Sequence, residues 1–269
     1  MSKSNGKYAL ITGATSGIGY ELAKLFAKDG YNLIIAARTE EHLQITSEDF
    51  ESKYGIEVVT IAKDLSQLNA PFEVYDELKA KGIRVDVLVN NAAQGQYGLF
   101  VETDIQRELE IVQLNIVAYL VLTKMFLKEM FARNEGKILQ VASIGGKLPG
   151  PLQSVYHATK AFIVSHTESL VNELKDTGVT ITALLPGPTD TDFFNKADME
   201  NTKMVQEGSL SDPAKVAKDG YEALMSGDSK VISGLKNKAQ VGMSHVLPDT
   251  MVAENIHKQM EQSDKPAKE

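Results

Sequence analysis

The stretch "YALITGATSGIG", residues 8–19, joins a short apolar run to a turn with three glycines. The run Tyr8–Thr12 is typical of a strand that is buried on both faces of a sheet. The glycines let the backbone turn sharply into the helix that we expect at Ile18–Lys28. They are Gly13, Gly17 and Gly19. A strand, a glycine-rich turn and a helix in this order predict the first unit of a parallel α/β sheet.

The same alternation continues along the chain. Further strand-like runs are expected at 32–37, 57–62, 86–90, 137–142, 180–185 and 230–233. Helical patterns between them occupy, among others, 40–53, 72–80, 104–132 and 155–175. We therefore predict a doubly wound, Rossmann-type α/β fold with a mostly parallel sheet and helices on both faces.

Domain organisation follows from the lack of any linker-like composition between residues 7 and 235. We expect a single domain over residues 1–255. Residues 188–212 have weak periodicity and follow a strand end, where α/β folds build their sites, so a substrate lid is predicted there. Residues 256–269 end in a charged stretch, which predicts a disordered tail.

Composition excludes several kinds of site. The 269 residues carry a formal net charge of −8 with scattered lysines, which argues against a nucleic-acid partner. The chain has no cysteine and its five histidines are dispersed, so thiolate chemistry is excluded and no metal site is expected. The apolar stretch Ile111–Leu127 is interrupted by Gln113, Asn115 and Lys124, so no membrane span is expected. The default location is the cytoplasm.

The glycine-rich turn can hold a pyrophosphate, because backbone N–H groups and the positive end of the next helix face the same point. Its spacing differs from the commonest dinucleotide fingerprint, and a tight connection without a ligand has the same appearance. Its place between the first strand and the first helix favours a dinucleotide site.

The end of the second strand indicates which dinucleotide fits. The sequence there is "IIAARTEEH", residues 34–42, and no acid follows until Glu40. NAD-binding proteins of this type place a carboxylate here for the ribose hydroxyl, whereas an arginine suits the 2′-phosphate of NADP. Arg38 therefore favours NADP(H), with NAD(H) as the alternative. A solvated side chain at a helix start is the other interpretation of Arg38.

Carbonyl reduction needs a proton donor and hydrogen bonds to the oxygen that gains charge. In "YHATK", Tyr156 and Lys160 are four residues apart and share a face if this stretch is helical. A nearby ammonium favours the phenolate and so makes tyrosine a better acid near neutrality. Ser143 ends the strand-like run "KILQVAS", at the edge where α/β sites form. Asn115 lies among apolar neighbours, and a buried core amide is its simplest interpretation.

Several of these features together resemble the classical short-chain dehydrogenase/reductase family over about residues 7–235. The features, with Asn115 and Ser143, are "TGATSGIG", "NNAA", "YHATK" and "PGPT". The resemblance implies an NAD(P)-dependent oxidoreductase with a seven-stranded parallel sheet. It also implies that Tyr156 is the acid/base, that Ser143 stabilises the substrate oxygen, and that Asn115 holds a water. Lys160 would bind the nicotinamide ribose and lower the pKa of Tyr156.

The same resemblance implies a set of cofactor contacts. Besides Arg38, Tyr156 and Lys160, they are Gly13, Ser16, Gly17, Ile18, Gly19, Asp64, Leu65, Asn91, Pro186, Gly187 and Thr189. One position departs from the family pattern, because "NNAA" ends in Ala93 where glycine is usual. A methyl group there would crowd the cofactor, or strain the backbone if a positive φ is required.

The substrate is a small carbonyl or alcohol compound of unassigned identity. We expect its pocket near Gln94, Gln96, Tyr97, Leu148, Leu152 and Phe193. By analogy with the family, the helices expected at 104–132 and 155–175 form a homo-oligomer interface, and the alternative is that both pack wholly against the sheet. The alternative function is a non-catalytic dinucleotide-binding or redox-sensing protein of the same fold. Intact Ser143, Tyr156 and Lys160 argue against it, since a binding module needs no acid.

Overall fold

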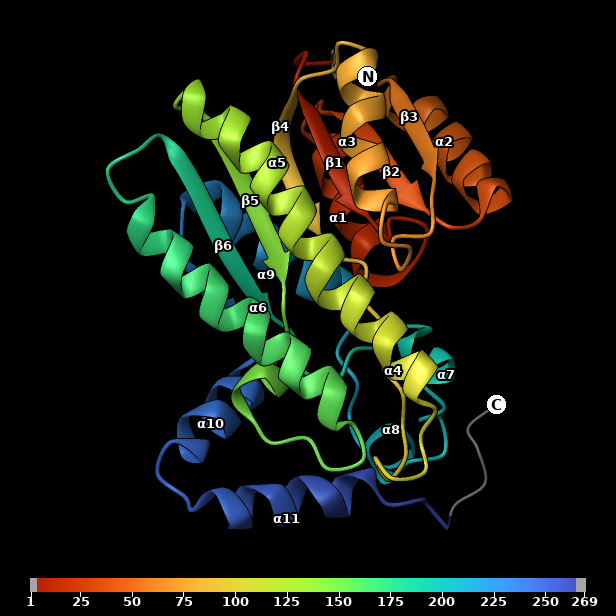
Figure 1. The fold of residues 1–269 in the computed structure, drawn as a ribbon, viewed down its shortest axis with the longest axis vertical. Helices are drawn as coiled ribbons and strands as arrows, with labels where there is room; N and C mark the ends of the chain where they lie inside the picture. Colours follow the sequence, from red (N-terminus) through yellow and green to blue (C-terminus); the bar gives the residue numbers. More distant parts are fainter. Residues whose placement is uncertain (1–3, 265–269) are drawn as a thin grey trace.

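The computed structural model describes residues 4–264 as a single α/β domain around a seven-stranded, all-parallel sheet (Figure 1). The strand order is β3-β2-β1-β4-β5-β6-β7. The strands are β1 (Tyr8–Thr12), β2 (Asn32–Ala37), β3 (Val58–Ala62), β4 (Val85–Asn90), β5 (Gly136–Val141), β6 (Val179–Leu185) and β7 (Lys230–Ile232). The predicted fold class is confirmed, and each expected strand lies within a residue or two of its prediction.

Helices cover both faces of the sheet, because successive strand residues point to opposite sides. The main helices of the first part are α1 (Gly17–Lys28), α2 (Glu40–Tyr54), α3 (Ala70–Ala80), α4 (Ile105–Val112), α5 (Tyr119–Ala132) and α6 (Ser154–Glu173). The later ones are α7 (Phe193–Lys196), α8 (Lys203–Gln206), α9 (Pro213–Ser226), α10 (Leu235–Ser244) and α11 (Asp249–Met260).

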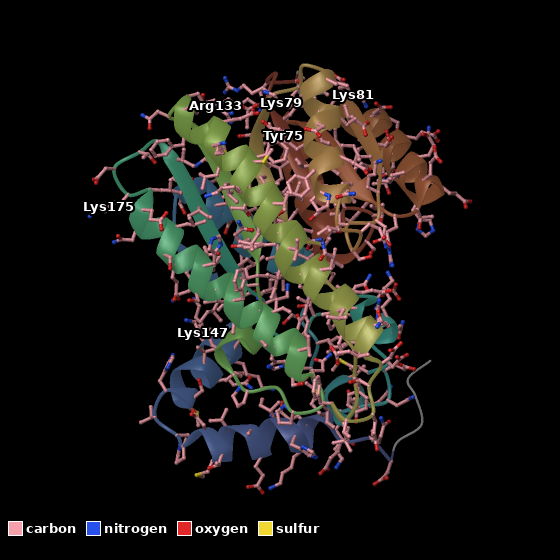
Figure 2. All side chains as sticks on the ribbon, viewed as in Figure 1. Tyr75, Lys79, Lys81, Arg133, Lys147 and Lys175 are labelled. Carbon is pink, nitrogen blue, oxygen red and sulfur yellow. The ribbon has the colours of Figure 1, made fainter. Side chains whose placement is uncertain are left out.

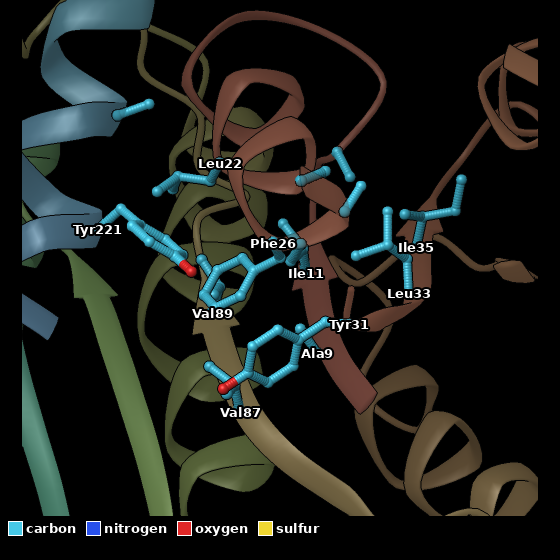
Figure 3. Close-up of a cluster of buried hydrophobic side chains, with 14 of the residues drawn as sticks. Ala9, Ile11, Leu22, Phe26, Tyr31, Leu33, Ile35, Val87, Val89 and Tyr221 are labelled. Atoms are coloured by element: carbon cyan, nitrogen blue, oxygen red, sulfur yellow. The ribbon is translucent and has the colours of Figure 1, made fainter. Parts of the chain in front are cut away.

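One face of the sheet carries α1 and α9. Figure 3 shows Ile11 and Val89 of the strands against Phe26 of α1 and Tyr221 of α9, and the two rings meet edge-on at 4.8 Å. Leu10, the next residue along β1, faces the other side and packs with residues of α3 and α5. Burying an apolar side chain on each face contributes about 1.5–3 kcal/mol per residue.

The helices α4 and α5 form one continuous helical segment, Ile105–Ala132, with a π-helical turn at Gln113–Ala118 between them. Its most apolar 18 residues have a mean hydropathy of 1.5, so by length and composition it qualifies as a membrane span, contrary to our expectation. In the fold, Leu122 and Phe126 are buried against the sheet. Its far end contacts α3, where Lys79 pairs with Glu129 at 2.9 Å, beside the labelled Tyr75 and Arg133 (Figure 2).

The C-terminal helices lie below the carboxyl ends of the strands, with α11 crossing the bottom of the molecule (Figure 1). The predicted disordered tail at 256–269 needs correction, because residues 256–260 form the last part of α11. Ile256 and Met260 are buried there in the same hydrophobic cluster as Phe194 and Ala197. Residues 265–269 of that prediction lie outside the described residues.

Candidate active site

The turn after β1 is shaped by glycines that tolerate no side chain. Gly13 and Gly17 have φ of +69° and +55°, in the left-handed region that favours glycine. A Cβ at Gly19 would lie 2.2 Å from the Gly13 carbonyl oxygen and 2.5 Å from Asn91 Nδ2. Asn91 Nδ2 in turn donates to the carbonyl oxygens of Thr12 and Gly13, at 2.9 and 3.1 Å. The turn is therefore a closely packed backbone cradle, of the kind that a pyrophosphate fits.

A cavity of about 490 Å³ runs from this turn to Tyr156 and beyond. Its size lies in the usual range for small-molecule and cofactor sites. Every residue that the sequence assigned to catalysis or cofactor binding lines it, apart from Gly19 and Asn115. Gly19 lies behind the cavity wall, where its lack of a side chain lets it pack closely against Gly13.

The end of the cavity nearest β2 is lined by Arg38, Lys63 and Asp64. Lys63 pairs with Glu73 at 2.6 Å, and Asp64 Oδ1 accepts from the backbone N–H and the hydroxyl of Ser66. Arg38 is exposed and has no ion pair among the described residues. Its guanidinium is the cation that remains available to a ligand at this end.

Tyr156, Ser143 and Lys160 meet in the middle of the cavity. Tyr156 and Lys160 lie about one helical turn apart near the start of α6, on one face, with Lys160 Nζ 5.7 Å from the centre of the Tyr156 ring. The same Nζ donates to the Val141 carbonyl oxygen at 2.8 Å, which fixes the ammonium at the end of β5. Ser143, just past β5, forms a hydrogen bond with Tyr156. The expected convergence is thus observed.

The pKa of Tyr156 runs against our expectation. Burial raises the pKa to about 12, and the hydrogen bond with Ser143 lowers it only in part. Burial also lowers the pKa of Lys160, to about 7. The protein's own groups therefore keep the phenol neutral and leave the lysine close to deprotonation at neutral pH, because desolvation outweighs the attraction between ammonium and phenolate.

Asn115 lies on the π-helical turn and is 1% exposed. Its Oδ1 accepts from Gln94 N, and its Nδ2 donates to Gln94 O and Thr159 Oγ1, all at 2.9–3.0 Å. The side chain thus joins the loop after β4 to α6. A small cavity of about 10 Å³ lies between Asn115 and Lys160, which is close to the least space that a buried water needs.

The remaining predicted contacts also lie where the sequence placed them. Pro186, Gly187 and Thr189 follow β6 along the cavity wall, and Thr189 Oγ1 donates to the Gly187 carbonyl oxygen at 2.9 Å. Ala93 lines the same wall with its φ outside the positive region, so the alanine causes no backbone strain. Its methyl group only narrows the cavity.

The other end of the cavity lies under the predicted lid. Phe193 packs against Tyr156 with ring centres 5.1 Å apart and the two rings tilted by 49°. Of the predicted pocket residues, Gln94, Leu148 and Phe193 line the cavity, whereas Gln96, Tyr97 and Leu152 do not. Tyr97 instead donates its hydroxyl to the Met260 carbonyl oxygen at 2.8 Å and so anchors α11.

Sequence reasoning missed the part of the wall that α10 and α11 supply. The missed residues are Gln240, Ile256, Gln259 and Met260, whereas Met199 and Met204 lie within the predicted lid. The spacing of Val252, Ile256 and Met260, four residues apart and all buried, was the available signal for an amphipathic helix. The charged end of the chain hid this pattern.

A search of known families matches residues 7–202, most of the chain, to the short chain dehydrogenase family. The chain belongs to this family. A very-long-chain 3-oxoacyl-CoA reductase of Pyrenophora tritici-repentis is 38% identical over 182 residues, which are 65% of this chain and 53% of the relative. The chain thus spans little more than half the length of that relative.

Solved structures of the family agree with the fold. A short-chain dehydrogenase from Sphingobium yanoikuyae in complex with NADPH matches with a TM-score of 0.80 and 25% identity, over 93% of this chain and 99% of that one. A short chain dehydrogenase/reductase from Burkholderia phymatum in complex with NAD matches with a TM-score of 0.80 and 26% identity, over 99% of this chain and 100% of that one.

Proposed function

We propose that this protein is an NADP(H)-dependent oxidoreductase that transfers hydride between nicotinamide and a carbonyl or alcohol substrate. The observation that carries the proposal is the meeting of Ser143, Tyr156 and Lys160 inside the cavity that begins at the glycine cradle. A binding or redox-sensing module would need the cradle but not the buried acid.

The catalytic steps of this chain centre on the substrate oxygen. Tyr156 Oη donates the proton to that oxygen during reduction, and it accepts the proton in the reverse direction. Ser143 Oγ donates a hydrogen bond to the same oxygen and so stabilises the charge that develops there. The contact of Phe193 with Tyr156 excludes water from one side of the Tyr156 ring.

Lys160 links the acid to the cofactor side. Its hydrogen bond to Val141 holds the ammonium beneath the Tyr156 ring. When protonated, it favours the phenolate and thereby opposes the effect of burial on the pKa of Tyr156. Asn115, with the small cavity beside it, provides a place for a water that passes protons toward Lys160.

The cofactor would supply or accept the hydride. Gly13, Ser16, Gly17 and Ile18 would hold its pyrophosphate, and Arg38 would bind the 2′-phosphate of NADP(H). The exposed guanidinium and the lack of a carboxylate at the end of β2 support this preference. The related structure with NAD shows that the family fold also accepts the other dinucleotide.

The lining of the substrate end favours a bulky, apolar carbonyl compound as the substrate. Met199, Met204 and Met260 line it, and methionine adapts to irregular apolar shapes. The 38% identical relative carries the name 3-oxoacyl-CoA reductase, which supports 3-oxoacyl thioesters as the first substrates to test.

We also propose that the protein is cytoplasmic, has no membrane or nucleic-acid partner, and assembles as a homo-oligomer.

The test is NADPH oxidation across aldehydes, ketones, 3-oxoacyl thioesters and steroids, with Tyr156→Phe as the matched variant. The variant should lose about 10²–10⁴-fold in turnover, because it lacks only the proton donor. Its affinity for NADPH should stay close to that of the parent. If NADPH binds but no substrate of the panel is turned over, or if the variant equals the parent, the binding-module function is the better one.

A further inference from the structure

Gln153 carries a buried amide that the protein does not satisfy. The residue is 4% exposed, and its Nε2 has no hydrogen-bond partner among the described residues. An unpaired buried donor costs about 1–3 kcal/mol, so a residue with no role at this position would be apolar.

The position of Gln153 sets it apart from the other unpaired buried groups. Among residues 4–264, unpaired buried side-chain atoms also occur on Gln96, Gln113, Arg133, Thr180 and Glu200. Gln153 lines the cavity, whereas these others do not. The cavity is therefore the place from which a partner for its amide can come.

Gln153 is also a neighbour of the acid. It precedes α6 by one residue, three positions before Tyr156, so the two side chains lie near the same end of the helix. Gln153 Nε2 and Tyr156 Cδ2 lie 3.1 and 3.5 Å from the point that a Cβ would occupy at Gly95. A donor thus lies next to the group that protonates the reacting oxygen.

We propose that the Gln153 amide binds a second oxygen of the substrate, close to the carbonyl that is reduced. This inference rests on the proposed function and narrows its substrate class to compounds with two nearby oxygens. In a 3-oxoacyl thioester the second oxygen is the thioester carbonyl, two carbons from the reacting one. It accepts from Gln153 Nε2, while the reacting oxygen accepts from Ser143 and Tyr156. Gln153 is a specificity-determining residue in this arrangement.

The experiment compares two substrates of equal chain length, a 3-oxoacyl N-acetylcysteamine thioester and the ketone that has a methylene in place of the thioester carbonyl. Gln153→Leu and Gln153→Met remove the amide and keep most of its volume. We expect kcat/KM for the thioester to fall about ten- to a hundred-fold in both variants, with the ketone nearly unchanged. Gln113→Leu, which removes a similarly unpaired Nε2 outside the cavity, should alter neither substrate.

The outcomes separate the two proposals. If the parent reduces both compounds but the Gln153 variants slow them equally, or slow neither, Gln153 has no part in recognition. If the parent reduces neither compound nor any other carbonyl of the panel, the proposed function fails and this inference falls with it. Thermal melting of both variants supplies the folding control, and we expect no loss of stability, since the removed donor had no partner.

Discussion

The two ends of the cavity are built in different ways. The cofactor end combines backbone after β1 and β4, held by glycines and by the hydrogen bonds of Asn91, with the Arg38 side chain after β2. The substrate end consists of side chains from α6, α7, α8, α10 and α11 that meet only in the folded chain. Binding one common cofactor needs backbone donors in fixed positions. Binding substrates that differ from one protein to another needs side chains that substitution can change.

Lys160 stands between the two ends, and its removal should have the largest effect on stability. Its pKa is about 7 in the fold and 10.5 in the unfolded chain, so from pH 7 to 10.5 the unfolded state binds more protons. The free energy of unfolding should therefore rise with pH in this window, by up to about 1.4 kcal/mol per pH unit. Below pH 7 the folded state bears the full cost of burying the charged Lys160 ammonium.

In Lys160→Met the free energy of unfolding should not show this rise with pH. The other titrating groups are the same in parent and variant, so their contributions cancel when the two are compared. Urea denaturation of parent and variant at pH 7, 8 and 9 measures the difference. Parallel curves would mean that Lys160 keeps its usual pKa. If Lys160 also binds the nicotinamide ribose, as the family resemblance implies, the variant should in addition bind NADPH more weakly. A loss of turnover alone would remove that second role.

The next effect contrasts two glycines, one behind the cofactor end and one exposed on α10. Gly19→Ala forces a Cβ against the Gly13 carbonyl and the Asn91 amide, and overpacking of this kind costs about 1–3 kcal/mol. We expect a lower melting temperature and weaker NADPH binding. Gly242→Ala in α10 meets no atom within 4 Å, so it should be neutral or stabilise by up to about 1 kcal/mol. Equal effects would show that the cradle is not closely packed.

The last effect concerns selectivity between cofactors. Arg38→Ala removes the free cation near β2 and should raise the KM for NADPH about tenfold or more, because a charge-assisted hydrogen bond contributes about 1.5–3 kcal/mol. The KM for NADH should hardly change. Met260→Ala, at the other end, should give the reverse pattern, with the carbonyl substrate's KM raised and that of NADPH unchanged. A similar loss with both dinucleotides would contradict the NADP preference.

Local patterns made the cofactor end predictable. The glycines, Arg38 and the strand ends are each determined by a few neighbouring residues, and parallel strands bring their carboxyl ends to one edge. Tyr156 and Lys160 were predictable because helical spacing fixes their common face. The substrate end was predicted only in part. Leu148 and Phe193 lie where expected, but Tyr97 anchors α11 and the predicted tail begins inside that helix.

The sequence by itself determined the alternation of strands and helices, the glycine cradle, and the acid Tyr156 with its neighbours Ser143 and Lys160. Only the tertiary structure decided that α11 closes the cavity and that burial raises the pKa of Tyr156 and lowers that of Lys160. It also decided that Gln153 Nε2 has no hydrogen-bond partner within residues 4–264. The physical reason is that desolvation and hydrogen-bond satisfaction depend on what surrounds a group in space. Those surroundings come from segments as far apart in the chain as Gly13 and Met260.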